Sequence, residues 1–187
     1  MRVLDFDNTI YNGESVLDFY IYSLRFNPRA IKLIFPVMSY ALRYKLGKMT
    51  VEQLEKGCVK YAHDYIASFA EPDKMVVSFW DSHMKKIKKW YEPQEDDVIL
   101  TASFNVIMDE VCRRLGVRNC ICSVINRETL NVEYLNFNKN KKDSFYRAFG
   151  TDAVADEFYT DNISDLPMIE IARKAYLVHG SEIKRIK

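Results

Sequence analysis

The segment "LDFDNTIYNGES", residues 4–15, places Asp5 and Asp7 two positions apart, directly after a short apolar run. The residues that lead into it, "MRVLD", have the pattern of a short β-strand. Carboxylates at the end of a strand cannot be buried cheaply, because a charge loses the solvation of water there. We therefore expect Asp5 and Asp7 to face a ligand.

The rest of the chain has two kinds of pattern. Between about residue 14 and residue 90 the apolar residues recur at three- and four-residue spacing, which indicates helices at 15–26, 30–46, 50–69 and 73–90. Thr50 and Gln53 form a capping-box pattern at the start of the third helix. After Pro93 strands and helices alternate. The expected strands are 97–103, 119–125, 157–161 and 175–180, with a strand or hairpin arm at 128–137, and the expected helices are 105–116, 142–150 and 164–174.

This order of elements predicts an α/β fold. Alternating strands and helices form a Rossmann-like parallel sheet with right-handed crossovers. The helical stretch is then an insert after the first strand. We expect a core made of residues 1–13 and 91–187, and an α-helical cap made of residues 14–90.

Composition and charge give broad limits. The chain has 187 residues, is 48% hydrophobic and 28% charged, and carries a formal net charge of +1, as an ordinary globular protein does. That charge provides no overall attraction to nucleic acid or membranes. Asp5 and Asp7 interrupt any signal peptide, and the longest uncharged apolar segment, residues 33–42, is about half of a membrane span. We expect a cytoplasmic protein that does not bind nucleic acid, and the oligomeric state stays open.

The cysteines and histidines do not form a recognisable metal motif. Cys58, Cys112, Cys120 and Cys122 contain no CxxC pair, and the three histidines lack zinc-binding spacing. Reduced core thiols are the favoured interpretation of the cysteines, and a metal or redox site is the alternative.

Four polar clusters fall at expected strand ends or at a helix start, where ligands bind in open parallel sheets. The clusters are Asp5 with Asp7, Thr101 with Ser103, Lys141 with Lys142, and Asp161 with Asp165. Each alone could be a turn, a helix cap or a solvated charge run. Together they suit phosphoryl transfer: carboxylates hold Mg²⁺, one carboxylate attacks phosphorus, a second exchanges a proton, and a hydroxyl and a lysine hold the phosphoryl oxygens.

The motif DxDxT at residues 5–9, with "YTDNISDLPM" at residues 159–168, resembles the haloacid dehalogenase superfamily. More narrowly, the chain is similar to its phosphoserine phosphatase-like subfamily (subfamily IB), whose helical cap follows the first motif. The resemblance implies that Asp5 is the nucleophile and a Mg²⁺ ligand. It implies that Asp7 is the general acid and base and binds the metal through its backbone carbonyl. Thr101 then binds the phosphoryl group, Asp161 is a metal ligand, and Asp165 supports the metal or the lysine.

Two adjacent residues compete for the role of the phosphate-site lysine. We prefer Lys142, because Phe145 and Phe149 follow it at three and seven residues, as in the helix of the family. Lys141 is the alternative. An acid at position 7 goes with phosphatases and phosphomutases within the superfamily.

The cap carries the substrate signals. Glu14 lies nine residues after Asp5, where phosphoserine phosphatases place a glutamate that faces the substrate, although a helix-end charge explains it equally well. Glu14 and Ser103 are therefore candidate substrate-binding residues. "TASF" and the pair Gly57–Cys58 depart from the phosphoserine phosphatase pattern. We expect the cap to close on two hinges: the "NGES" turn at residues 12–15, which contains Gly13, and residues 91–97, which have the pattern of an exposed linker.

The cap also has a strongly basic stretch. Residues 20–48 contain six basic residues, several aromatic residues and no acid. A solvated cap face is one interpretation. The other is a surface that recognises an anionic phosphate ester, and peripheral contact with a membrane that carries a lipid phosphate is one version of it. The run "KKIKKW", residues 85–90, is interpreted as a helix-end charge run rather than a nucleic-acid site.

These observations predict a Mg²⁺-dependent phosphomonoester phosphatase that forms an aspartyl-phosphate on a small or lipid-linked phosphate ester. The alternatives are a phosphotransferase of the same fold and a non-catalytic module that binds a phosphate ligand.

Overall fold

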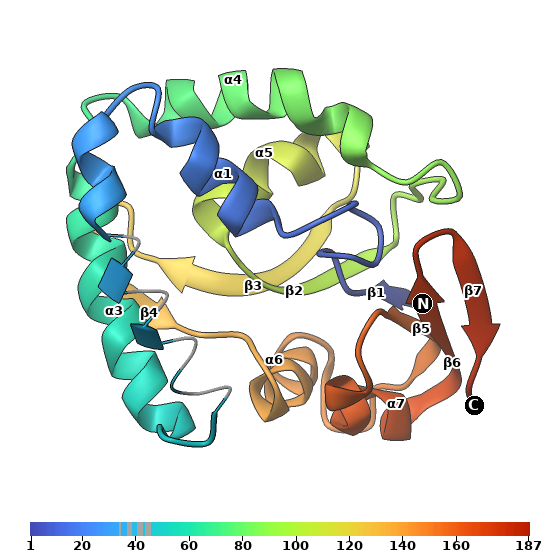
Figure 1. The fold of residues 1–187 in the computed structure, drawn as a ribbon. Helices are drawn as coiled ribbons and strands as arrows, with labels where there is room; N and C mark the ends of the chain where they lie inside the picture. The colour runs from blue at the N-terminus through green and yellow to red at the C-terminus, as the bar shows by residue number, and fades with distance from the viewer. Residues whose placement is uncertain (34, 37–38, 41–42, 44–45) are drawn as a thin grey trace.

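The computed structural model describes residues 1–33, 35–36, 39–40, 43 and 46–187 (Figure 1). It contains a seven-stranded sheet with the strand order β4-β3-β2-β1-β5-β6-β7. The strands are β1 (Arg2–Leu4), β2 (Val98–Phe104), β3 (Asn119–Ile125), β4 (Val132–Tyr134), β5 (Ala155–Thr160), β6 (Ala172–His179) and β7 (Glu182–Arg185). The α-helices are α1 (Ser15–Ser23), α3 (Val51–Ala67), α4 (Pro72–His83), α5 (Asn105–Leu115), α6 (Lys139–Phe149) and α7 (Leu166–Ile171), and the short 3₁₀ helices are η1 (Pro28–Leu33), η2 (Met84–Lys86) and η3 (Ile163–Asp165).

The central five strands run parallel. β1 lies in the middle, between β2 and β5, and β3 and β6 flank these two strands. β4 and β7 pair antiparallel at the two edges. The predicted α/β fold with a Rossmann-like parallel sheet is therefore confirmed.

Alternating strand residues divide the interior into two hydrophobic clusters. Leu4 and Ile99 pack with side chains of α1, α4 and α5 on one face of the sheet. Val3 and Val98, the neighbouring residues, pack with α6 and α7 on the other. This is the two-residue period of a strand that is buried on both faces. Figure 1 shows the same layers, with α1, α4 and α5 on one side of the sheet and α6 and α7 on the other.

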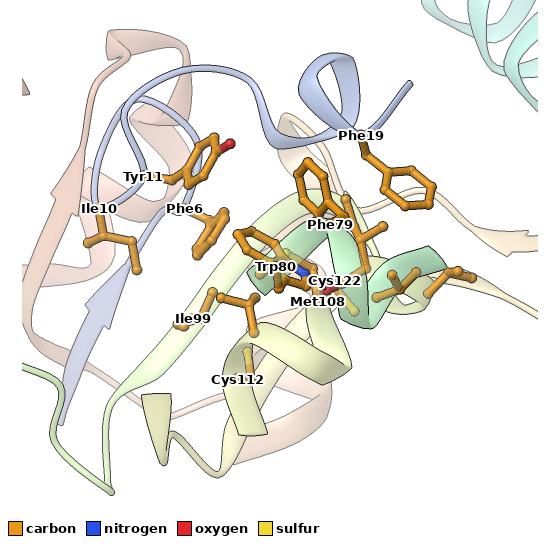
Figure 2. Close-up of a cluster of buried hydrophobic side chains, with 14 of the residues drawn as sticks. Phe6, Ile10, Tyr11, Phe19, Phe79, Trp80, Ile99, Met108, Cys112 and Cys122 are labelled. Atoms are coloured by element: carbon orange, nitrogen blue, oxygen red, sulfur yellow. Dashed lines mark hydrogen bonds between the residues drawn. The ribbon is translucent and has the colours of Figure 1, made fainter. Parts of the chain in front are cut away.

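Helix α4 packs on one face of the sheet and contributes to its hydrophobic core, although the helix lies in the predicted cap segment. Its residues Phe79 and Trp80 are fully buried, and the Trp80 ring lies edge-on to Phe6 and Tyr11, which follow β1 (Figure 2). Trp80 Nε1 also donates to the backbone oxygen of Ile107 in α5 at 2.8 Å. The division into core and cap at residues 14 and 90 stays a prediction, and the packing shows that α1 and α4 share the hydrophobic cluster of the sheet.

Several predicted boundaries were wrong. The helix expected at 73–90 ends at His83, and Ile87 instead forms a β-bridge with Tyr11. The helix expected at 164–174 ends at Ile171, because Ala172 already pairs with Ala155 of β5. Strand β7 was not predicted. The capping box of Thr50 and Gln53 is confirmed. The helix expected at 30–46 starts as η1, and much of it lies outside the described residues.

The predicted exposed hinge at residues 91–97 is anchored at both ends. Tyr91 and Asp97 are buried, and the Tyr91 hydroxyl donates to Asp97 at 2.9 Å. The Arg2 guanidinium donates two hydrogen bonds of 2.7 Å to the Asp97 carboxylate. Only residues 92–96 are exposed. Because the Asp97 carboxylate is fully buried, loss of its charged partner would be costly, and this connection is therefore held in place.

None of the helices in the described ranges combines the length and apolarity that a membrane crossing requires.

The packing of α4 leads to a stability prediction. Trp80→Ala should lower the free energy of unfolding by about 3–5 kcal/mol, because it leaves a cavity between α4, α5 and β1. Val77→Ala, on the same helix but 43% exposed, is the control and should change it by less than about 0.5 kcal/mol. Urea unfolding of the two variants measures both values. A loss below about 1 kcal/mol for Trp80→Ala would contradict the assignment of α4 to the core.

Candidate active site

The four predicted polar clusters meet at one cavity beyond the carboxyl ends of β1, β2 and β5. The cavity has a volume of about 210 Å³. It is lined by Asp5, Asp7, Asn8, Glu14, Thr101, Ala102, Phe137, Asn138, Lys141, Asp161, Asn162, Ser164 and Asp165. A larger hollow of about 470 Å³ lies at the amino ends of the strands. We assign the site to the smaller cavity, because ligands of parallel sheets bind at the carboxyl ends and the buried carboxylates gather there.

Asp5, like Asp165, is a buried acid of the cavity. Its backbone N–H donates to Tyr159 O at 2.9 Å, which extends the pairing of β1 with β5. Its side chain accepts a hydrogen bond of 2.9 Å from Lys141 Nζ. Burial raises the pKa of Asp5 to about 6, although the positive charge of Lys141 lowers it. Lys141 thus stabilises the ionised form of the buried Asp5 carboxylate.

Lys141 joins two acids. Its Nζ also donates to Asp165 Oδ2 at 2.8 Å, and the Thr160 hydroxyl donates to the same oxygen. Burial by itself lowers the pKa of Lys141, but the charges of Asp5 and Asp165 raise it overall. Lys141 therefore stays a cation between two buried carboxylates.

The preference for Lys142 over Lys141 was wrong, because Lys142 does not line the cavity. Lys142 Nζ lies over the Tyr146 ring, 5.6 Å from its centroid, whereas Lys141 points into the cavity. Lys141, Ser144 and Phe145 are the buried residues of α6, so the inward face runs through Lys141 and Phe145, four residues apart. Phe149 is partly exposed and is therefore a poor guide to the register of the helix.

A buried asparagine that the sequence did not reveal holds α6 in place. The Asn136 side chain donates to the backbone oxygens of Thr101 and Ile121 at 2.9 and 3.0 Å. It accepts a hydrogen bond of 2.6 Å from the Ser144 hydroxyl. Asn136 thus connects the helix of Lys141 to β2 and β3. It lies in a loop, where no periodic pattern marks it.

Asp7 is held by two serines. Its Oδ1 accepts from the Ser15 backbone N–H and its Oδ2 from the Ser103 hydroxyl, both at 2.6 Å. The Ser15 and Ser103 hydroxyls are 2.9 Å apart, and both residues are buried. Burial raises the pKa of Asp7, although these hydrogen bonds lower it. Ser103, expected to bind substrate, instead contacts Asp7, and Ser15 was missed because it resembles an ordinary helix-start residue.

The loop between Asp7 and Glu14 is supported by a second lysine. Asn8 and Asn138, which both line the cavity, have positive φ angles of 55° and 51°. Such angles are uncommon outside glycine and collect at functional sites. Lys88 Nζ donates to the backbone oxygen of Asn8, and burial lowers the pKa of Lys88. Lys85 and Lys86 thus end the short helix η2, as the helix-end interpretation expected, whereas Lys88 contributes to this loop.

The remaining predicted residues also line the cavity. Thr101 is buried, and its Oγ1 accepts from the Ser103 backbone N–H at 3.1 Å. Glu14 is the exposed residue that precedes α1, and its carboxylate accepts from the Asn8 side chain at 2.6 Å. Asp161 follows β5, and burial together with the charge of Asp5 raises its pKa to about 6.

Comparison with known proteins gives the family. A family model described as haloacid dehalogenase-like hydrolase matches residues 3–170. The chain belongs to the haloacid dehalogenase-like hydrolase family. This match confirms the predicted superfamily, and it confirms that the predicted phosphatase belongs to a family of hydrolases. A search of curated proteins gives no match.

Solved structures share this haloacid dehalogenase fold. A protein of unknown function from Bordetella pertussis Tohama I has a TM-score of 0.70 at 14% identity, over 94% of this chain and 87% of that chain. A phosphoserine phosphohydrolase-like protein from Francisella tularensis has a TM-score of 0.50 at 16% identity, over 94% and 86% of the two chains. A probable phosphoserine phosphatase from Vibrio cholerae has a TM-score of 0.56 at 11% identity, over 92% of this chain and 54% of that chain.

The donor set of this haloacid dehalogenase site fits Mg²⁺. Asp5 and Asp161 are two carboxylates in one cavity, and the negative charge of Asp5 raises the pKa of Asp161. A cation between them would relieve this repulsion. Within the described residues no group of three or more His, Cys, Asp or Glu side chains is arranged as a metal site. One or two carboxylates with a carbonyl and water are enough for Mg²⁺, which accepts oxygen ligands and keeps several waters.

The two raised pKa values predict how the stability of the metal-free protein depends on pH. Asp5 and Asp161 hold protons up to about pH 6 when folded, compared with 3.8 ordinarily. A raised folded pKa gives stability that is complete below the unfolded value and lost as the pH rises through the folded value. In chelator, the free energy of unfolding should therefore decrease as the pH rises from about 4 to about 7. The decrease should be larger in the wild type than in Asp161→Asn, which lacks one of the two acids.

Urea unfolding in chelator at several pH values measures this difference. The exposed Asp152→Asn is the control and should behave as the wild type. Added Mg²⁺ should stabilise the wild type at pH 7 more than it stabilises Asp161→Asn. The same pH dependence in the wild type and Asp161→Asn would show that the ionised Asp161 carboxylate does not destabilise the folded protein.

Proposed function

We propose that this protein is a Mg²⁺-dependent phosphomonoester phosphatase that forms an aspartyl-phosphate on Asp5. The observation that carries the proposal is the buried pair of Asp5 and Lys141, 2.9 Å apart, in the cavity that also contains Asp7. A nucleophile, a cation for the phosphoryl oxygens and a second acid are the groups that phosphate-ester hydrolysis through a covalent intermediate requires. Membership of the hydrolase family and the fold shared with phosphoserine phosphatase-like proteins support it.

In the first step an Asp5 oxygen attacks phosphorus, and the bond from phosphorus to the ester oxygen breaks. Asp7 gives its proton to the leaving oxygen, so that the product is a neutral alcohol. Burial raises the pKa of Asp7, which favours the protonated form needed at this stage. Ser15 and Ser103 fix both oxygens of the Asp7 carboxyl, so it faces the cavity in one orientation.

In the second step water attacks the phosphorus of the aspartyl-phosphate. Asp7 takes a proton from this water, the bond from phosphorus to Asp5 breaks, and inorganic phosphate leaves. The Lys141 ammonium donates to phosphoryl oxygens in both steps, together with the Thr101 hydroxyl. Asp165 holds Lys141 from the other side, at 2.8 Å.

Mg²⁺, bound by Asp5, Asp161 and the backbone carbonyl of Asp7, would neutralise charge that develops on the phosphoryl oxygens. The role of Glu14 at the rim is to contact the part of the substrate that leaves as the alcohol.

The proposal is tested with Asp5→Asn. This variant should fold normally and retain less than about 1% of the wild-type turnover of p-nitrophenyl phosphate, because an amide oxygen is a poor nucleophile. Wild-type protein quenched in acid during turnover should carry one phosphoryl group, which mass spectrometry detects, and Asp5→Asn should carry none. Activity above a few per cent in Asp5→Asn would contradict the covalent mechanism. No hydrolysis of any phosphate ester by the wild type would favour a binding module.

A second prediction separates the two lysines. Lys141→Ala should lower kcat by about 10²–10³, because it removes a charged donor from a buried phosphate site. Lys142→Ala, which removes only the contact with Tyr146, is the matched control and should stay within about twofold of the wild type. Steady-state kinetics at saturating Mg²⁺ provide both values. Similar effects of the two substitutions would show that Lys141 does not contact the transferred group.

A further inference from the structure

Helix α1 is apolar on its outer face as well as its inner face. Phe19 and Tyr22 are buried against α4. On the outer face, Leu17 and Ile21 are 50% and 55% exposed, one helical turn apart. An ordinary surface helix carries polar residues there. This face therefore has the character of a contact surface.

The apolar face continues past the end of α1. Phe26, which is 56% exposed, contacts the Tyr22 ring, and the Arg25 guanidinium lies 4.7 Å from the centroid of the same ring. The Tyr20 hydroxyl donates to Ala30 O at 2.7 Å, which ties η1 to α1. Four further residues that follow are exposed, two of them basic and two large and apolar: Arg29, Ile31, Lys32 and Phe35.

The same surface is positively charged. The chain has no acid between residues 20 and 48, and six basic residues. Among the residues that the structure describes, no carboxylate forms an ion pair with Arg25, Arg29 or Lys32. Exposed cations interleaved with exposed Leu, Ile and Phe are the pattern of a segment that lies at a lipid interface.

The surface begins at the mouth of the active site. Glu14 lines the cavity and directly precedes α1, and Leu17 lies in the first turn of that helix. After β5, Ile163 and Leu166 are 64% and 50% exposed, next in sequence to the cavity residues Ser164 and Asp165. Exposed apolar side chains therefore follow or adjoin cavity residues in two separate segments of the chain.

We propose that this surface docks on an anionic lipid bilayer, and that the substrates are phosphomonoesters carried by lipids in that bilayer. The α1 surface consists of Leu17, Ile21, Arg25, Phe26, Arg29, Ile31, Lys32 and Phe35. The substrate class rests on the phosphatase function proposed above, whereas the docking does not. Negative lipid head groups complement the basic residues, and the interface accepts the apolar ones. A second copy of the chain fits less well, because a symmetric dimer would bring the same unpaired cations together.

The test is co-sedimentation of the whole protein with vesicles. The wild type should sediment with phosphatidylcholine vesicles that contain about 30 mol % phosphatidylglycerol and should stay in solution with pure phosphatidylcholine. The double variant Ile21→Glu with Arg25→Glu should bind anionic vesicles at least about tenfold more weakly. Ile183→Glu with Lys184→Glu in β7 makes the same chemical change on exposed residues elsewhere and should bind as the wild type.

Activity separates docking from catalysis. The Ile21→Glu with Arg25→Glu variant should hydrolyse p-nitrophenyl phosphate as the wild type does, and should lose about tenfold or more of its activity on phosphatidate in anionic vesicles. Wild type that hydrolyses p-nitrophenyl phosphate but stays in solution with anionic vesicles would overturn the docking proposal alone. Vesicle binding without hydrolysis of either ester would overturn the phosphatase function and leave the docking intact. If the wild type dimerises and does not bind vesicles, and the double variant Ile21→Glu with Arg25→Glu stays a monomer, the surface would be assigned to contact with a second copy of the chain.

Discussion

The structure of the active site depends on one buried cation. Lys141 lies between Asp5 and Asp165, and both carboxylates would be expensive to bury without it. Each partner comes from a different part of the chain: the end of β1, the start of α6 and the η3 turn after β5. The charge balance therefore fixes how these three elements meet. Hydrogen bonds from Thr160 to Asp165, and from Ser144 to Asn136, complete the support. An ion pair this deep stabilises a fold only where such partners are present.

The same site keeps unfavourable features that the rest of the fold must offset. Asp5 and Asp161 are acids with raised pKa values in one cavity, and Asn8 and Asn138 have strained backbone angles at its edge. The two hydrophobic clusters of the sheet offset this strain. The sharing of the larger cluster by α1 and α4 places the start of α1, and with it Ser15, in a fixed position. The orientation of Asp7 thus follows from packing that lies far from the chemistry.

The sequence predicted the sheet and the acids because both signals are local. Asp5, Asp7 and Asp161 closely follow strands, and Asp165 ends the short helix η3 that comes next. The carboxyl ends of parallel strands meet at one edge of the sheet. The position of the lysine has no such local signal. Asn138 precedes α6 without a side-chain cap, so the sequence does not mark where the helix begins, and a shift of one residue exchanges Lys141 for Lys142. Asn136 and Ser15 act through tertiary contacts that leave no pattern in the sequence.

The limits of the cap could not be predicted for a related reason. Apolar spacing shows that α4 has a buried face, but not whether that face meets the cap or the sheet. In the structure it meets the sheet, and the connection at residues 91–97 is anchored by Asp97. Closure of the whole segment 14–90 as one lid would break the packing of α4 on the sheet, so any closing movement is restricted to the chain between α1 and α4. Phosphoryl transfer nonetheless requires that water be excluded. If the α1 surface docks on lipid, the bilayer covers the mouth of the cavity, and the fold then needs no large lid.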